Sequence, residues 1–278
     1  MQTETPLQSQ PIYRDLLFRS ALYAVIAYFI AFLFEKLLMT SGAFIFNYYF
    51  KLTYDKLVVH ASRTIWSQES VMAIYLFPSL LSGLLIVVLY YIIQNQKSKP
   101  DYTPLFLLWL MYFLSLRVIG MAPFHFLFRN GLYHAFLWLY LGRIVQVLAG
   151  VAALIIFFIF SIKVLKSIYF VTGIMNGNIK TIGNHDLIMS SFLIPLFITA
   201  LAGLLFFLPY PPHDELAGLG LAILPACYCF VMLKLNAPPF LEMVLIEGKK
   251  SRPWLLFAIG LAMIISARIL LGFGISGN

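Results

Sequence analysis

Seven stretches of the chain are each apolar over about 18 residues or more, the length at which a helix crosses the hydrocarbon core of a bilayer. Their approximate bounds are 16–39, 71–93, 104–121, 132–162, 187–208, 216–233 and 254–273. Only 11% of the 278 residues are charged, whereas soluble domains carry roughly 25%. We therefore predict an all-α fold: one integral membrane domain, 1–278, forming a polytopic transmembrane helical bundle. About seven spans are expected, and six to eight fit because the third run is short and the fourth overlong.

The distribution of basic residues predicts the orientation of the chain, because lysine and arginine accumulate in cytoplasmic loops. With the N-terminus in the cytoplasm, eleven of these residues lie on the inside and four on the outside. The inside set is Arg14, Arg19, Lys97, Lys99, Lys163, Lys166, Lys180, Lys234, Lys249, Lys250 and Arg252, and the outside set is Lys51, Lys56, Arg63 and Arg129. We expect a multi-pass protein of the bacterial inner membrane, with the C-terminus in the periplasm if there are seven spans.

Two segments outside the spans carry further expectations. Residues 1–15 are polar and predict a cytosolic tail, and residues 41–70 form the predicted outer loop. The aromatic and β-branched content of that loop favours an interfacial helix or a short hairpin. The segment PYPPHDE (209–215) predicts a stiff outer turn in which His213, Asp214 and Glu215 are solvated.

The net charge alone does not decide which class of partner the protein has. The value of +8 would suggest nucleic acid in a soluble protein. In a membrane protein, contact of basic loops with anionic lipid headgroups explains it, so no nucleic-acid partner is expected.

The motifs of soluble enzymes are missing. There is no GxxxxGK[ST], no GxGxxG after a strand and no GxSxG elbow. The five histidines form no HExxH motif and no i, i+4 pair, and Cys227 and Cys229 point about 200° apart on a helix. We predict no metal, no cofactor and no enzymatic activity.

Charged residues within the predicted spans are Glu35, Lys36, Arg117, Arg143 and Arg268. Such groups usually face the bundle interior and find partners, since an ionised group at mid-bilayer costs at least ~2.5–3.5 kcal/mol. Most of them lie near a predicted helix end, from which a long side chain reaches the headgroups. Arg143 differs, because it lies about 11 residues past the start of the fourth run, roughly 17 Å deep at the helical rise.

Three intramembrane arginines then face one intramembrane carboxylate, Glu35, which is the candidate ion-pair partner. The planar guanidinium suits phosphate and carboxylate groups. We therefore predict a pocket toward the outer half for a small organic anion or an anionic lipid. Its candidate residues are Arg117, Arg143 and Arg268, with Tyr140 and Gln146 beside Arg143 and with His125 and Arg129 at the mouth.

Three segments carry a resemblance to a known family: YDKL (54–57), FPSLLSG (77–83) and NGLYHAFLWLY (130–140). In these segments the chain resembles an uncharacterised family of polytopic inner-membrane proteins of Bacteroidota. A looser resemblance is to the site-2 protease architecture. FEKLL (34–38) keeps the glutamate of the HExxH motif, Glu35, while Phe34 and Leu38 stand where the zinc-binding histidines would be. That resemblance implies an inactive relative without zinc.

Three functions follow as hypotheses. The scarcity of polar groups favours a subunit or assembly factor of a larger membrane complex, with other membrane subunits as partners. The arginines favour a transporter or binder of a small anion or anionic lipid. An intramembrane enzyme would have Glu35, His125 and His134 as its acid–base groups.

Overall fold

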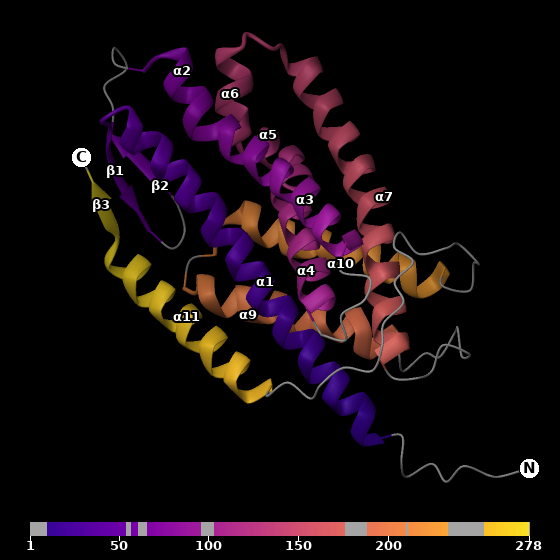
Figure 1. The fold of residues 1–278 in the computed structure, drawn as a ribbon. Helices are drawn as coiled ribbons and strands as arrows, with labels where there is room; N and C mark the ends of the chain where they lie inside the picture. The colour runs from indigo at the N-terminus through magenta and orange to yellow at the C-terminus, as the bar shows by residue number, and fades with distance from the viewer. Residues whose placement is uncertain are drawn as a thin grey trace, which may run out of the picture.

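The computed structural model describes residues 10–53, 57–60, 66–95, 103–175, 188–209, 211–232 and 253–277, and it is a helical bundle (Figure 1). Within these ranges, six helical stretches are long and apolar enough to cross a membrane. They are Leu17–Ile45, Gln68–Asn95, Thr103–Phe128, Arg143–Thr172, Met189–Phe207 and His213–Val231. A further helix, α11 (Pro253–Phe273), corresponds to the last predicted run. The predicted multi-pass transmembrane bundle is confirmed.

Helix α1 (Gln10–Ile45) is the longest element and lies against most of the bundle. It packs on α4 (Thr103–Ser115), on α9 (Ile194–Phe207), and on the π-helical segments η1 (Met72–Leu76) and η3 (Met189–Leu193). Its first residues, 10–15, are helical, so the predicted N-terminal tail is shorter than expected.

Interlocked aromatic rings form the core between α1 and α4. Tyr28 meets Phe113 edge to face with ring centroids 5.4 Å apart, and Trp109 stacks on Phe113 at 5.9 Å. The indole of Trp109 also donates a hydrogen bond of 3.1 Å to the hydroxyl of Ser20. Ser20 in turn donates to the carbonyl of Ser191 at 2.6 Å, which ties η3 to the same core. These contacts satisfy the polar atoms that the apolar interior would otherwise leave unpaired.

The third span continues past its predicted end. After α4 come η2 (Leu116–Gly120) and α5 (Ala122–Phe128). The third predicted run ended at 121, whereas the helical stretch reaches Phe128. Pro123 sits in the first turn of α5, where its missing N–H has no helical partner to lose.

The predicted run 132–162 is two helices rather than one. A short helix, α6 (Leu132–Trp138), is followed by a turn and then by the long α7 (Arg143–Met175). Tyr140 in this turn has a positive φ of 55°, a backbone conformation that a helix does not contain. The fourth span therefore starts at Arg143.

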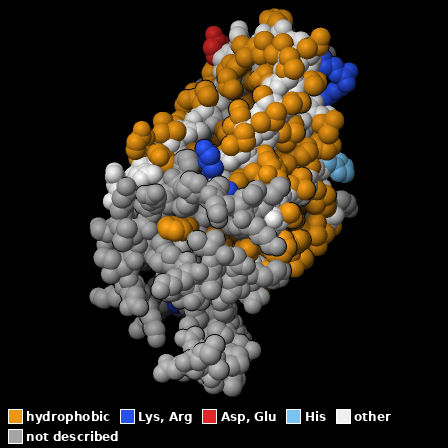
Figure 2. Space-filling model, turned by 90° about the vertical axis from the view of Figure 1, so that its right-hand side faces the viewer, with side chains coloured by type: hydrophobic (Ala, Val, Ile, Leu, Met, Phe, Trp, Pro, Cys, Tyr) orange, Lys and Arg blue, Asp and Glu red, His pale blue; other side chains and the backbone are white. Residues whose placement is uncertain are grey.

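The remaining spans are α2 (Gln68–Val71), which runs through η1 into α3 (Phe77–Asn95), and α10 (His213–Met232). Among the six long spans, Gln68–Asn95, which contains α3, and Arg143–Thr172 of α7 are the least enclosed, with 22% of the residues in their most apolar parts buried. The face seen in Figure 2, on the side where α7 lies in Figure 1, is mostly hydrophobic where the structure describes it. Such a surface suits lipid.

A three-stranded antiparallel sheet lies at the end of the bundle where α1 ends, which we call the sheet end (Figure 1). Its strands are β1 (Tyr49–Leu52), β2 (Leu57–His60) and β3 (Ile275–Gly277), in the order β2-β1-β3. The β1–β2 pair confirms the predicted hairpin within the outer loop. That loop is narrower than expected, because residues 41–45 belong to α1 and residues 68–70 to α2.

The pairing of β3 with β1 places the end of α11 beside the end of α1. Gly277 pairs with Phe50 and Ile275 pairs with Leu52, so α11 ends beside the end of α1. Helix α1 begins at the opposite end of the bundle (Figure 1). An odd number of crossings is needed to connect the start of α1 to the end of α11. The bundle thus agrees with seven spans when α11 crosses together with the other six.

Candidate functional site

A buried ion cluster centred on Arg117 lies inside the bundle. One guanidinium nitrogen, Nη1, is 2.7 Å from Oε1 of Glu215 and 3.5 Å from Oε2 of Glu35. The other, Nη2, donates a 3.3 Å hydrogen bond to the hydroxyl of Tyr28. The guanidinium also lies 5.0 Å from the ring centre of Phe32. The side chains of Arg117 and Glu215 are 3% and 4% exposed, so their charges are paired almost without water.

Three elements distant in sequence bring these groups together. Arg117 is in η2, where the wider π-helical turn displaces side chains from the regular helical positions. Glu35 is late in α1, and Glu215 is in the first turn of α10. A carboxylate in that turn also interacts favourably with the N-terminal end of the helix dipole.

The prediction that Glu215 is solvated in an outer turn is wrong. The residue is 4% exposed and lies inside the bundle. Its neighbour Asp214 is half-buried, while His213 is exposed. The available signal was that Glu215 directly precedes an apolar run, which places it one turn into a span. A second signal was that three arginines in the predicted spans had only one carboxylate, Glu35, so a further carboxylate inside the bundle was to be expected.

A chamber of about 340 Å³ adjoins this cluster toward the sheet end. Its walls come from the end of α1, β2, η1, the start of α3, α5, α6 and the start of α10. Most of the polar side chains that line it are ionisable or amide groups. The polar lining residues are Glu35, Lys36, Tyr75, Ser79, His125, Asn130, His134 and Asp214. A cavity of this size is at the lower end of the range for small-molecule sites.

Several polar atoms that line the chamber make no hydrogen bond, although Oε2 of Glu35 is ion-paired with Arg117 at 3.5 Å. Five buried side-chain nitrogen or oxygen atoms of the described residues lack a hydrogen bond, and three of them belong to lining residues. These three are Oε2 of Glu35, Nδ1 of His125 and Oδ1 of Asn130. A fourth, Nε of Arg117, belongs to the adjoining cluster. A hydrogen-bond donor that enters the chamber would therefore meet acceptor atoms on Glu35 and Asn130 that make no hydrogen bond within the protein.

Local geometry holds these atoms in place. Nδ2 of Asn130 donates a 2.7 Å hydrogen bond to Asp214, which leaves Oδ1 of the same amide directed elsewhere. The backbone N–H of Asn130 donates to the carbonyl of His125 at 3.0 Å. Gly131 follows with a positive φ of 50°, and a Cβ there would lie 3.0 Å from the His125 ring. A glycine is therefore required where the chain closes over this imidazole.

His134 forms another part of the wall. Its ring lies 5.0 Å from that of Tyr75, with the two planes tilted by 41°. Burial lowers the pKa of His134, because the charged imidazolium loses its water. The structure thus places Glu35, His125 and His134, the three groups considered as acid–base residues, around one chamber.

The predicted arginine pocket does not form as one site. Arg117 is paired with Glu215 and with Glu35, the predicted partner, so the count of a single intramembrane carboxylate is wrong. Arg268 belongs to another part of the bundle, where Nη2 donates a 2.6 Å hydrogen bond to the carbonyl of Leu208. Arg143 lies in a third part of the bundle, beside Arg129.

The predicted depth of Arg143 is also wrong. It is the first residue of α7 and is exposed, because the span starts there and not at Leu132. It lines a groove of about 560 Å³ together with Arg129 and Gln146. Gln146 donates a 3.0 Å hydrogen bond to the carbonyl of Leu141, and Tyr140 is 92% exposed. Of the residues predicted for the arginine pocket, His125 is the one that lines the polar chamber together with Glu35, the predicted ion-pair partner.

Comparison of the chain with protein-family models, with curated proteins and with solved structures finds no match. The resemblances to the Bacteroidota family and to site-2 proteases therefore stay predictions. Within the described residues, no three histidine, cysteine, aspartate or glutamate side chains are grouped so that they could hold a metal ion.

Proposed function

We propose that this integral membrane protein binds a small organic cation with N–H donors, of the primary ammonium class, in the chamber at the sheet end. The observation that carries the proposal is the set of buried atoms without a hydrogen bond on Glu35, His125 and Asn130. Of these, Oε2 of Glu35 also lies 3.5 Å from Nη1 of Arg117. A carboxylate oxygen and an amide oxygen only accept hydrogen bonds, and a neutral imidazole accepts at one nitrogen. An ammonium group has three N–H donors, which matches three acceptors on residues that line the same chamber.

The charges of the chamber and its cluster favour the same class of ligand. Three carboxylates, Glu35, Asp214 and Glu215, face the two cations Lys36 and Arg117, which leaves a formal charge of −1 with neutral histidines. The ammonium of Lys36 lies 5.5 Å from the ring centre of Phe32, which is part of its environment. An anion would meet an excess of carboxylate here, so the proposal replaces the predicted anion at Arg117.

The excess of basic residues in the other loops supports an orientation in which the sheet end faces outward. In a bacterial inner membrane, ligand would then enter the chamber from the periplasm. The proposal assigns binding to the protein, and the expectation that it catalyses no reaction stays a prediction.

A thermal-shift series on the purified full-length protein tests the proposal. Methylammonium is expected to raise the melting temperature of the wild type in a saturable way, because a ligand that binds only the folded state stabilises it. Glu35→Gln and Asn130→Leu each remove an acceptor and are expected to abolish the shift. Arg143→Gln, on an exposed residue outside the chamber, is the control and keeps it. Equal shifts in all four proteins would contradict the proposal.

A role as a subunit or accessory factor of a larger membrane complex is the second candidate. The sparse burial of α3 and α7 favours it, since partner helices as well as lipid can cover such apolar faces. Native mass spectrometry after gentle extraction from the source membrane shows whether partner helices or only lipid cover these faces. A stoichiometric second polypeptide supports the subunit role, and a bare monomer under these conditions counts against it.

A further inference from the structure

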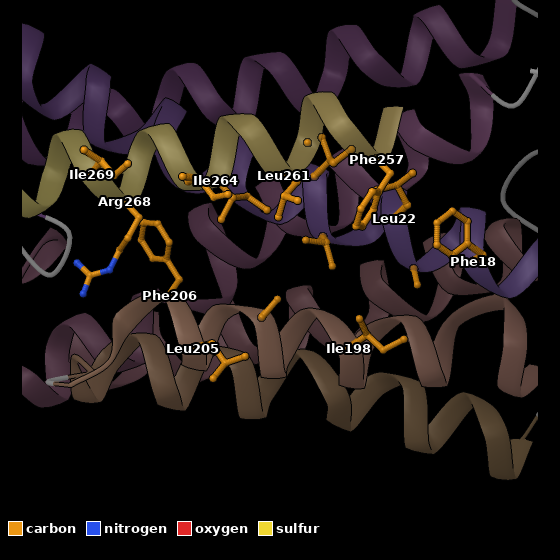
Figure 3. A pocket seen from close by; sticks show the side chains of 16 residues that line it. Phe18, Leu22, Ile198, Leu205, Phe206, Phe257, Leu261, Ile264, Arg268 and Ile269 are labelled. Atoms are coloured by element: carbon orange, nitrogen blue, oxygen red, sulfur yellow. The ribbon is translucent and has the colours of Figure 1, made fainter. Parts of the chain in front are cut away.

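A second cavity, on the lipid-facing side of the bundle, differs in character from the polar chamber. This groove lies between α1, α9 and α11 and has a volume of about 580 Å³. Fifteen of the sixteen residues that line it are apolar or glycine, and the exception is Arg268. In Figure 3 the side chains of α11 and α9 face one another across the groove, with Arg268 at one end and Phe18 at the other.

The two ends of the groove are closed by different contacts. At the end far from the sheet, the rings of Phe18 and Phe257 lie 6.0 Å apart. At the sheet end, the guanidinium of Arg268 lies 5.8 Å from the ring centre of Phe206. Along the middle, Gly260 brings α11 close to α1, because a Cβ there would lie 2.7 Å from the side chain of Ile26. Helix α11 therefore contacts α1 while α9 forms the opposite wall.

The length of the groove fits a lipid chain. Phe257 and Arg268 are about 11 residues apart, which is roughly 16 Å along a helix. That is about half of a ~30 Å hydrocarbon core and hence about one leaflet. The groove runs along α11, so an acyl chain in it would keep the direction that lipid chains have in the bilayer (Figure 3).

Arg268 gives the groove a charged end at the depth where a headgroup would lie. Its hydrogen bond to the carbonyl of Leu208 orients the guanidinium. Arginine is always protonated and has five N–H donors in a planar fork that matches phosphate. Arg268 lies five residues before Phe273, the last residue of α11, and β3 follows at the sheet end.

We propose that this groove binds one acyl chain of an anionic phospholipid, with the phosphate on Arg268 in the leaflet at the sheet end. The proposal is independent of the polar chamber, which shares none of the groove's lining residues. Of the three arginines predicted for an anionic-lipid pocket, the proposal keeps Arg268 alone, because Arg117 is paired with Glu215 and Arg143 lines a different groove with Arg129.

Native mass spectrometry of the full-length protein from nanodiscs tests this site. With equal amounts of phosphatidylglycerol and phosphatidylcholine, the wild type is expected to retain one phosphatidylglycerol in preference to phosphatidylcholine. Arg268→Gln is expected to lose that preference by about tenfold, since a charge-assisted hydrogen bond to phosphate is lost. Arg143→Gln is the matched control and keeps the preference.

A groove-filling variant separates the acyl chain from the headgroup. Ala202→Phe places a ring inside the groove without changing its charge, and it is expected to reduce retention of both lipids. Circular dichroism and gel filtration confirm that each variant remains folded, and Arg268→Met, which also removes the charge, replaces Arg268→Gln if the latter does not. An unchanged lipid preference in the folded Arg268 variant, or unchanged retention in Ala202→Phe, would overturn the proposal.

Discussion

Nη1 of Arg117 lies 2.7 Å from Oε1 of Glu215, although 98 residues separate them in sequence. The pair joins η2 to the first turn of α10 within the membrane-spanning part of the bundle. Both side chains are buried, so each neutralises a charge that water cannot reach. A buried pair of this kind adds little net stability, but the loss of one partner strands the other.

Glu215→Leu is therefore expected to destabilise the protein by about 3–5 kcal/mol, because it leaves Arg117 with only the more distant Glu35. Thermal or chemical unfolding in detergent measures this. Glu35→Gln is expected to cost less, since its contact with Arg117 is 3.5 Å and its side chain is 15% exposed. The double variant Arg117→Met/Glu215→Leu is expected to recover much of the lost stability. A double variant as unstable as the sum of the single variants would show that the pair is not coupled.

Gly131→Ala is expected to lower both stability and ligand binding. The positive φ of 50° disfavours a Cβ, which would also lie 3.0 Å from the His125 ring. A destabilisation of about 1–2 kcal/mol is expected from the backbone alone. Gly142→Ala is the control, because a Cβ there meets nothing within 4 Å. Comparable losses in the two variants would mean that Gly131 does not hold the imidazole.

Gly42→Ala tests the crossing of α1 and η1, which positions Tyr75 in the chamber wall. A Cβ at Gly42 would lie 2.8 Å from the carbonyl oxygen of Ala73, so the two helices must separate. Overpacking of this kind typically costs about 1–3 kcal/mol. Gly220→Ala, which has open space around it, is the reference. Unfolding measurements that give both variants wild-type stability would exclude a tight crossing.

The stability of the protein is expected to fall as pH drops below about 6.5, and His134 contributes to this fall. Its pKa is lower in the folded state than the ordinary value of 6.5, because burial disfavours the imidazolium. As pH falls through 6.5, the unfolded chain binds the proton first and is stabilised relative to the folded state. The loss continues until pH passes the folded pKa.

His134→Phe keeps a ring against Tyr75 and removes the titrating group. The variant is expected to lose less stability than the wild type between pH 7 and pH 5, where the slope is measured by unfolding at each pH. His213→Gln, on an exposed residue of α10, is the control and is expected to retain the wild-type slope. Parallel slopes in the wild type and His134→Phe would assign the effect to other groups.

The sequence alone predicts the spans well, because long apolar runs are a property of the bilayer and need no tertiary information. The β1–β2 hairpin is also local and was predicted. The pairing of β3 with β1 was not, since it joins residues more than two hundred positions apart.

The site was harder to predict for two physical reasons. A turn within an unbroken apolar run leaves no signal in the hydrophobicity pattern. The turn at Tyr140, with its positive φ, was therefore missed, and Arg143 was predicted at mid-membrane although it starts α7. The first turn of α10 is polar and was read as part of a loop. Glu215 was therefore predicted to be solvated, although it lies inside the bundle. Both errors changed the charge balance. The prediction had an excess of arginine, whereas the structure pairs Arg117 with Glu215 and Glu35 beside a chamber in which acceptor atoms make no hydrogen bond.

Isothermal titration calorimetry with two ammonium ions tests the proposed chamber most directly. Methylammonium and tetramethylammonium carry the same charge, but only the first has N–H donors for Glu35, His125 and Asn130. The chamber of about 340 Å³ has room for either ion, so size does not decide the result. We expect saturable one-to-one binding of methylammonium to the wild type, much weaker binding of tetramethylammonium, and loss of methylammonium binding in Asn130→Leu. Equal binding of the two ions, or no binding of methylammonium, would contradict a site built for hydrogen-bond donors.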